Sequence, residues 1–356
     1  MISPLPGAQR LGPIDLVRGA GVLMVAGAHL TLHDPRLSAG FLSFYGLTKI
    51  ALELFFALSG FLMLYTWDAR AQKKASYRGF YVRRFFRIMP LWWLVISFYV
   101  WWRGFGLDVW ALNVTFLFGF VSFVPRFIPL ALSWSLFVEE VFYLIFPLLL
   151  NAGRRWGLML LYVALRVLAW AIRNYAGEID PLLVQNNYHL RSPLTNLYCF
   201  ALGMLFYELW KSKSASWEVK DQRWWVWPLC FGVLATQALW SIWPRDIVIL
   251  AVLFAAFMPG RALVPRVITQ VVSWIGVRCY FVYLVHTIFF RLTTPLRHWI
   301  LAQEQWGTSY DTLIHLYLLC ALMGICALAE ISYRFFESPL NRLGARLAAR
   351  FETVKN

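Results

Sequence analysis

The sequence predicts an all-α polytopic membrane protein of about ten transmembrane helices, with both termini in the cytoplasm. Of its 356 residues, 60% are hydrophobic and only 14% are charged, whereas soluble domains carry about 25% charged residues. Apolar runs long enough to cross ~30 Å of hydrocarbon recur along the whole chain. The 19 Trp and 16 Tyr fit the two membrane interfaces, where amphipathic rings settle.

Hydropathy windows of about 19 residues place the individual spans. They are expected at 14–32, 42–67, 84–103, 132–151, 155–173, 194–210, 224–243, 246–260, 274–291 and 311–333. The stretch 107–124 is also apolar, but Pro125 and Pro129 follow it closely. We therefore expect this stretch to be a re-entrant or interfacial segment.

Neither an internal repeat nor a long polar linker divides the chain, so residues 1–356 are expected to form one transmembrane domain. Its ends are a short N-terminal segment, 1–13, and a C-terminal tail, 334–356. When the ten spans are threaded, most Lys and Arg fall on the side that holds both termini, and this excess marks the cytoplasmic side. The net charge of +15 then reflects orientation in the membrane, and we expect no nucleic-acid partner.

The cysteines indicate neither a disulfide framework nor a zinc site. All of them lie within apolar runs and none forms a C-x-x-C pair. They are Cys199, Cys230, Cys279, Cys320 and Cys326. We expect them to be packing residues and predict no metal centre.

Ionisable residues inside the predicted spans are the main functional signal, because each costs at least ~2.5–3.5 kcal/mol to insert. They are Arg18, His29, Glu53, Glu139, Glu140 and His286. At ~1.5 Å of rise per residue, His29 lies ~16 Å further from the cytoplasm than Arg18. Glu139 and Glu53 reach roughly 10 and 16 Å inward from the outer face, and His286 reaches a depth similar to that of His29. Two histidines and two carboxylates are thus expected in one layer above an arginine.

Structural roles compete with this interpretation. A histidine inside a membrane is often a hydrogen-bonded packing residue, and His286 fits either role. Glu53 also fits an i,i+4 ion pair with Lys49, which we favour, and Glu330 with Arg334 forms another such pair.

The basic segment RGFYVRRFFRIMP (78–90) has two interpretations. Arg83, Arg84 and Arg87 stand at helical spacing, and their guanidinium forks match phosphate oxygens. The same side chains also suit the anionic headgroups of membrane lipids. The sequence is compatible with both.

Several segments together resemble the acyltransferase 3 family of membrane O-acyltransferases. They are RLGPIDLVRGAGVLMVAGAHL (10–30), with Arg18 and His29 at an Arg-x10-His spacing, LELFFALSGFLM (52–63), FYVRRFFRIMPLWW (80–93), SWSLFVEEVFYLIFP (133–147), VSWIGVRCYFVYLVH (272–286) and SYRFFESP (332–339). Cys279 stands where the family usually has a serine. Order and spacing agree along the whole chain.

The resemblance implies transfer of an acyl group, usually acetyl, from cytoplasmic acetyl-CoA to a hydroxyl of a cell-surface glycan or its lipid-linked precursor. It also implies a location in the bacterial inner membrane. The predicted catalytic residues are His29, Arg18 and Glu139; those for CoA are Arg83, Arg84, Arg87 and Arg18; those for the acceptor are His286, Glu53 and Trp134. Some relatives carry a fused extracytoplasmic SGNH domain, but this chain ends at Asn356 without one. We therefore expect it to deliver the acyl group itself or to pass it to a partner protein outside.

In the mechanism we expect, His29 takes the proton of the acceptor hydroxyl as that oxygen attacks the thioester. Glu139, or alternatively Glu53, orients the imidazole. A covalent acyl-histidine fits equally well. The main alternative function is a transporter or flippase of a glycan or small molecule, because charged residues in spans also mark transport pathways. A regulatory partner with decayed catalytic residues is another. The sequence leaves the acceptor, the length of the acyl group and the oligomeric state open.

Overall fold

The chain is helical throughout the part that the structure describes. The computed structural model describes residues 12–31, 48–71, 76–121, 130, 132–150, 155–179, 181–184, 187–214, 244–257 and 265–352. Within these ranges there is no strand, which confirms the prediction of an all-α polytopic membrane protein. The predicted span 224–243 lies outside the described residues.

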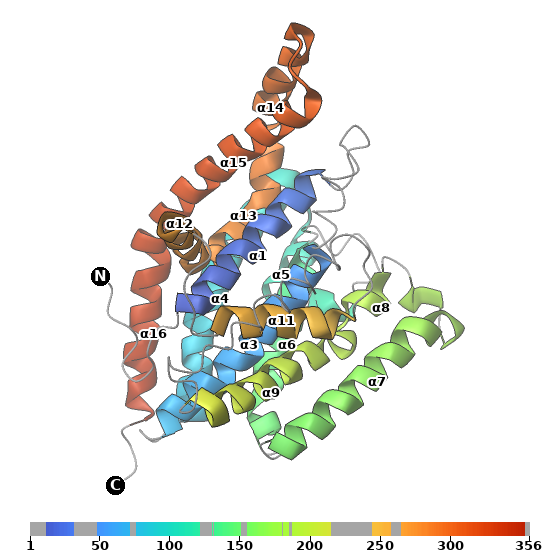
Figure 1. The fold of residues 1–356 in the computed structure, drawn as a ribbon, viewed down its shortest axis with the longest axis vertical. Coiled ribbons are helices and arrows are strands. Elements are labelled where there is room, and N and C mark those ends of the chain that lie inside the picture. Colours follow the sequence, from blue (N-terminus) through green and yellow to red (C-terminus); the bar gives the residue numbers. More distant parts are fainter. Residues whose placement is uncertain are drawn as a thin grey trace. The chain divides into compact units, whose positions relative to one another are not determined.

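The helices follow the predicted apolar runs closely (Figure 1). The α-helices are α1 (Gly12–Thr31), α3 (Thr48–Ala71), α4 (Tyr77–Arg103), α5 (Leu107–Val114), α6 (Ser133–Leu149), α7 (Arg155–Ile179), α8 (Tyr188–Arg191), α9 (Leu197–Ser214), α11 (Arg245–Phe257), α12 (Arg266–Val277), α13 (Cys279–Leu292), α14 (Thr294–Leu301), α15 (Tyr310–Ser332) and α16 (Ser338–Arg350). Short 3-10 helices are η1 (Leu117–Phe120), η4 (Pro181–Leu183), η6 (Pro193–Thr195) and η7 (Ala302–Trp306), and a π-helical turn, η8 (Tyr333–Glu337), joins α15 to α16.

Two predicted spans differ from the structure in form. The span expected at 274–291 is divided between α12 and α13, which meet at an angle of 80° at Arg278. The span expected at 311–333 continues through η8 and α16 as far as Arg350. The apolar stretch 107–124 contains α5 and η1, separated by Phe116 with a left-handed φ of 60°. At 1.5 Å per residue, the eight residues of α5 are too short to cross the membrane by themselves.

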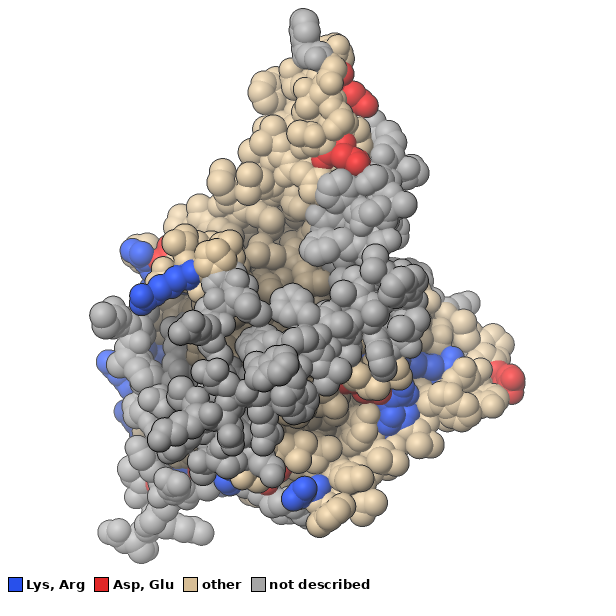
Figure 2. Space-filling model, viewed as in Figure 1, with Lys and Arg blue, Asp and Glu red and all other residues tan. Residues whose placement is uncertain are grey.

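Length and apolar composition qualify four of the described helices as membrane spans, or five if the bent pair α12–α13 counts as one. They are Ile50–Arg70, Tyr77–Arg103, Arg155–Ile179 and Tyr310–Arg350. On the face seen in Figure 2, most described residues are neither basic nor acidic, and Lys and Arg lie in a few separate patches. The number of about ten spans and the sidedness of both termini stay predictions.

The chain splits into two compact units, each described separately below. The α4 unit comprises Met1–Arg10, Phe56–Ala215 and Glu337–Asn356. The α1 unit comprises Leu11–Phe55 and Ser216–Phe336. That residues 1–356 act as a single domain stays a prediction.

In the α1 unit, two glycines bring the backbones of α1 and α12 into contact. A Cβ on Gly276 would lie 1.7 Å from the carbonyl oxygen of Asp15, and one on Gly19 would lie 1.9 Å from that of Val272. Small residues permit such close approach of membrane helices, which associate largely through packing. The two contacts fix α12, and therefore the start of α13, against α1.

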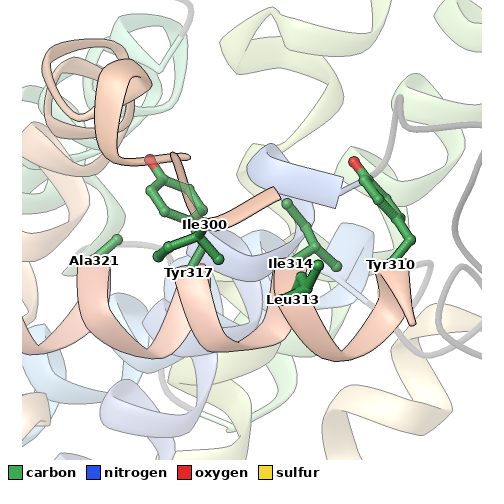
Figure 3. Close-up of a cluster of buried hydrophobic side chains, with 6 residues drawn as sticks. All are labelled: Ile300, Tyr310, Leu313, Ile314, Tyr317 and Ala321. Carbon is green, nitrogen blue, oxygen red and sulfur yellow. The ribbon is translucent and has the colours of Figure 1, made fainter. Parts of the chain in front are cut away.

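The far end of α13 is held by a buried cluster from α14 and α15 (Figure 3). The cluster consists of Ile300, Tyr310, Leu313, Ile314, Tyr317 and Ala321. Phe289 and Phe290 of α13 pack against it. The hydroxyls of Tyr317 and Thr293 share a hydrogen bond of 2.7 Å, which satisfies a polar group that packing would otherwise bury unpaired.

In the α4 unit, α3 and α9 pack through glycines in the same way. A Cβ on Gly60 would lie 2.1 Å from the Phe200 carbonyl, and one on Gly203 would lie 1.8 Å from that of Ala57. The Phe200 ring stacks on Phe142 of α6, with ring centroids 4.0 Å apart. Aromatic stacking therefore joins α6 to the α3–α9 pair.

Candidate active site

Two predicted site residues, His29 of α1 and His286 of α13, lie together in the α1 unit. Nε2 of His286 is 3.4 Å from Nδ1 of His29. Their ring centroids are 5.1 Å apart and the rings meet edge to face at 61°. His286 is completely buried, whereas His29 is exposed. The pair thus has one covered member and one that a substrate can reach.

Backbone carbonyls determine which nitrogen of each ring carries the proton. Nδ1–H of His29 donates to the Val25 carbonyl at 2.8 Å, and Nδ1–H of His286 donates to that of Tyr283 at 2.8 Å. A carbonyl can only accept, so in both rings Nε2 holds the lone pair. Nε2 of His286 therefore faces the Nδ1–H of His29, and the Nε2 of His29 has the character of a base.

Arg278 stabilises the bend that directs α13 toward α1. Its guanidinium donates to the Trp274 carbonyl at 2.9 Å and forms a hydrogen-bonded ion pair with Glu330 of α15. It also lies 4.0 Å from the ring centre of Trp274 and 4.8 Å from that of Tyr333. A buried charge is tolerated when it is paired and hydrogen-bonded, and Arg278 is only 8% exposed. His286 is two turns further along α13, so Arg278 helps to orient it.

We expect Arg278→Ala to destabilise the protein by about 1–3 kcal/mol, because the partly buried carboxylate of Glu330 loses one of its two cationic partners and keeps only Arg334. Arg278→Lys should recover only part of this, since an ammonium lacks the planar fork that stacks between two rings. The midpoint of thermal unfolding in detergent, with Arg266→Ala at the exposed start of α12 as control, measures the difference. Equal unfolding midpoints for all three variants would contradict the role of Arg278 in stabilising the bend.

Glu330 also binds Arg334, so the predicted i,i+4 pair is confirmed. Arg278 is the member of this group that sequence reasoning missed. Its only signal was position, in the middle of the motif that carries His286. Cys279, beside it, opens α13 and packs against the buried cluster around Val22 and Ile325, in line with a packing role.

Glu53 has a partner that the sequence did not indicate. Its Oε1 lies 2.7 Å from Nη1 of Arg245, the first residue of α11. The Glu53 side chain is 5% exposed and that of Arg245 is 44% exposed. The side chain of Lys49, the expected partner, lies outside the described residues. Glu53 is therefore a buried carboxylate held by a cation from a distant helix, which favours a structural role.

Arg18 is half-buried on α1, three turns before His29. The intervening helix spans ~16 Å at 1.5 Å per residue. This separation is that predicted from the sequence, because both residues lie on one unbroken helix. The positive charge of Arg18 and the histidine pair therefore lie at two different heights along α1.

In the α4 unit, Glu139 of α6 is held by two hydroxyls. Ser59 of α3 donates to its Oε1 at 2.8 Å, and the hydroxyl of Tyr143, one turn along α6, donates to the same oxygen. The guanidinium of Arg84 lies 5.2 Å from the centre of the Tyr143 ring. Next to Glu139, Oε1 of Glu140 is buried and makes no hydrogen bond within the described residues.

The three arginines of α4 that were predicted to bind CoA have three different surroundings. Nη1 of Arg83 is 2.6 Å from Oε1 of Glu352, just beyond α16. Arg84 lies over the rings of Tyr143 and Phe80, and Arg87 is exposed. They therefore do not form one uniform phosphate-binding face in the free protein. Arg83 and Arg87, four residues apart, share a side of the helix.

Trp134, the last predicted acceptor residue, is half-buried near the start of α6 and packs edge to face on Phe56 at 6.3 Å. The predicted residues thus form two groups. His29, His286, Arg18 and Glu53 belong to the α1 unit, and Glu139, Trp134 and the α4 arginines belong to the α4 unit. That Glu139 orients His29 stays a prediction. Among the cysteines, Cys199 is buried, Cys326 packs against the cluster around Val22 and Ile325, and Cys230 lies outside the described residues.

Comparison with known proteins gives the geometry a context. The family model of the acyltransferase domain matches residues 12–334, which include both histidines and both groups of site residues. The chain is 26% identical to "Peptidoglycan O-acetyltransferase OatA" of Listeria monocytogenes over 93% of its length. It is 24% identical to "Putative peptidoglycan O-acetyltransferase YrhL" of Bacillus subtilis over 95%.

The chain spans only 56% of the length of each of these two relatives. No solved structure matches it. The family match covers nearly all of the described helices, from α1 into η8, and agrees with the resemblance carried by the Arg-x10-His spacing and the later motifs. The chain therefore belongs to the acyltransferase 3 family.

Proposed function

We propose that the protein is a membrane O-acetyltransferase. It moves an acetyl group from cytoplasmic acetyl-CoA to a hydroxyl of a cell-surface glycan, or of its lipid-linked precursor, in the bacterial inner membrane. The observation that carries the proposal is the contact of His29 with His286, which gives one exposed imidazole a base at Nε2 and a buried partner at Nδ1. Membership of the family supports acyl transfer, and the names of the two relatives support an acetyl group and a glycan acceptor.

His29 acts as the general base in this mechanism. Its Nε2 takes the proton of the acceptor hydroxyl while the hydroxyl oxygen attacks the thioester carbonyl. The new C–O bond forms, the C–S bond breaks, and the CoA thiolate leaves and takes up the proton from His29. General-base assistance of this kind contributes about 10²–10⁴-fold to the rate.

His286 supports the charge that develops on His29. When His29 holds a second proton, its Nδ1–H strengthens its bonds to the Val25 carbonyl and to Nε2 of His286, because hydrogen bonds from a charged donor are stronger. The third member of a catalytic triad stabilises a charged histidine in the same way. His286 is thus a positioning residue as well as a predicted neighbour of the acceptor.

The other predicted residues keep their expected roles in the proposal. Arg18 stands along the path of the pantetheine arm, and Arg83, Arg84 and Arg87 take the CoA phosphates or lipid headgroups. The roles of Glu139 in orienting His29, and of Trp134 and Glu53 toward the acceptor, stay predictions from the sequence. Peptidoglycan is the first acceptor to test, because it appears in the names of both relatives. A partner protein outside the membrane remains part of the proposal.

Acetyl transfer can be measured with the full chain in proteoliposomes, using isotope-labelled acetyl-CoA outside and glycan fragments as acceptor. The expected result is release of CoA thiol matched by labelled O-acetyl groups on the glycan, which mass spectrometry identifies. Transport of a glycan without any consumption of acetyl-CoA would contradict the proposal and favour the transporter alternative. Cells with and without the gene should differ in the same O-acetyl groups.

His286→Ala should lower kcat by about 10- to 100-fold, the value of one hydrogen bond to a charged group. His286→Gln should recover part of the rate, because an amide oxygen can accept from the Nδ1–H of His29. The Michaelis constant for acetyl-CoA should change little in both. Equal kcat values for wild type and His286→Ala would exclude the supporting role while leaving His29 as the base.

A further inference from the structure

A carboxylate from the C-terminal end of the chain lies between two arginines in the α4 unit. Oε1 of Glu352 is 2.6 Å from Nη1 of Arg83 on α4 and 4.0 Å from Nη1 of Arg70 in the last turn of α3. The side chains of Arg70 and Arg83 are 13% and 12% exposed, and that of Glu352 is 18% exposed. Three elements thus bring two cations and one anion together in a mostly covered place.

The packing of α16 on α4 places this carboxylate. A Cβ on Gly344 would lie 2.6 Å from Cβ of Phe86, so that α16 touches α4 directly. Further along, a Cβ on Gly79 would lie 3.1 Å from the Ala348 carbonyl and 3.2 Å from Oε1 of Glu352. The bare backbone at Gly79 therefore leaves space for an anion beside Arg83.

The hydrogen-bonding groups of Arg83 and Glu352 are not fully satisfied by their contact. Nη1 of Arg83 and Oε1 of Glu352 are both buried, and neither meets the geometry of a hydrogen bond despite their short separation. Two guanidinium groups also exceed the charge of one carboxylate by one unit. A phosphate group offers more oxygens and more charge, and guanidinium forks match its oxygens in pairs.

We propose that Arg70 and Arg83 form a binding site for a phosphate group of the acyl donor, and that Glu352 occupies this site until the donor displaces it. The inference rests on the proposed function, because that function supplies a donor with phosphates. It adds Arg70 to the donor-binding residues, and it makes the segment after α16 an internal competitor. Arg87, one turn beyond Arg83 on the same side of α4, is placed for a neighbouring phosphate.

The covered position favours the donor over lipid headgroups, the other source of phosphate. Lipid headgroups are met by exposed basic side chains at the interface. The side chains of Arg70 and Arg83 are instead mostly buried, and Glu352 lies against both. A ligand that reaches them must replace Glu352.

The test measures binding of CoA itself, by calorimetry, to the full chain in nanodiscs. Glu352→Gln should tighten CoA binding about two- to fivefold, the effect of removing one weak competing ion pair. Arg70→Gln should weaken it by a similar factor. In an Arg83→Gln background, which lacks the cation nearest to Glu352, the gain from Glu352→Gln should disappear, since the competition requires that cation.

Glu178→Gln is the matched control, because Glu178 is an exposed glutamate on α7 and the change adds the same charge. It should leave the dissociation constant unchanged. Equal CoA affinity of wild type and Glu352→Gln would overturn the inference, although acetyl transfer could still occur. A gain that vanishes when anionic lipid is replaced by zwitterionic lipid would assign the site to headgroups and overturn the donor assignment. Absence of any CoA binding to wild type would overturn the inference and the proposed donor together.

Discussion

Replacement of His29 by alanine is expected to lower acetyl transfer by about 10²–10⁴-fold, the contribution of a general base. The variant loses the only exposed member of the His29–His286 pair, and with it the Nε2 that takes the proton. Folding should change little, because an exposed side chain on one face of α1 contributes little packing. Release of CoA thiol in proteoliposomes measures the rate, and CoA binding and thermal unfolding show whether the protein is otherwise intact.

His315→Ala on α15 is the control for this substitution. His315, like His29, uses Nδ1 to bond the carbonyl four residues earlier, at Asp311. Its loss should leave the rate unchanged. Transfer by His29→Ala at the rate of wild type would remove the proposed mechanism, and an acetyl group trapped on His29 in wild type would instead support the covalent variant.

Replacement of Gly276 by alanine is expected to be strongly destabilising. Its new Cβ would lie 1.7 Å from the carbonyl oxygen of Asp15, and backbone on both sides cannot move aside as a side chain can. Overpacking of this kind typically costs about 1–3 kcal/mol, and here α1 and α12 must separate. Because α12 sets the start of α13, the same change should also pull His286 away from His29. The midpoint of thermal unfolding and the rate of acetyl transfer should therefore both fall.

Gly12→Ala is the matched control, because nothing lies within 4 Å of a Cβ at Gly12, at the start of the same α1. It should leave both measurements within error of wild type. Gly19→Ala, across the α1–α12 contact, should reproduce the loss, since its Cβ would lie 1.9 Å from the Val272 carbonyl. If Gly276→Ala unfolded at the temperature of Gly12→Ala, the close contact of the two helices would be wrong.

Features that depend on local composition could be predicted from the sequence. Long apolar runs must form helices in a membrane, since no water is present to satisfy the backbone there. For this reason most of the long described helices, such as α1, α3, α6 and α9, fall close to the positions that the hydropathy windows gave. The pair of Glu330 and Arg334 was also predictable, because helical geometry alone brings residues four apart together. The similar depth expected for His29 and His286 is in keeping with their contact.

Features that depend on which helix packs against which could not be predicted. Arg245 is remote in sequence from Glu53, and Arg278 is remote from Glu330, so periodicity gives no sign of either pair. The bend at Arg278 was hidden because the windows average over the apolar residues on both sides of it. Likewise, three arginines at helical spacing on α4 do not reveal that Arg83 and Arg84 bind different neighbours.

The contact of Arg83 with Glu352 also constrains how often the chain crosses the membrane. Two side chains in contact lie on one face of the bilayer, so the chain between them must cross it an even number of times. The number of predicted spans from 84–103 to 311–333 is even when 107–124 is not counted as a span. It becomes odd when 107–124 is counted. With the spans predicted from the sequence, an even number of crossings therefore requires the stretch 107–124, which contains α5 and η1, to be re-entrant or interfacial, as we expect from the two prolines that follow it.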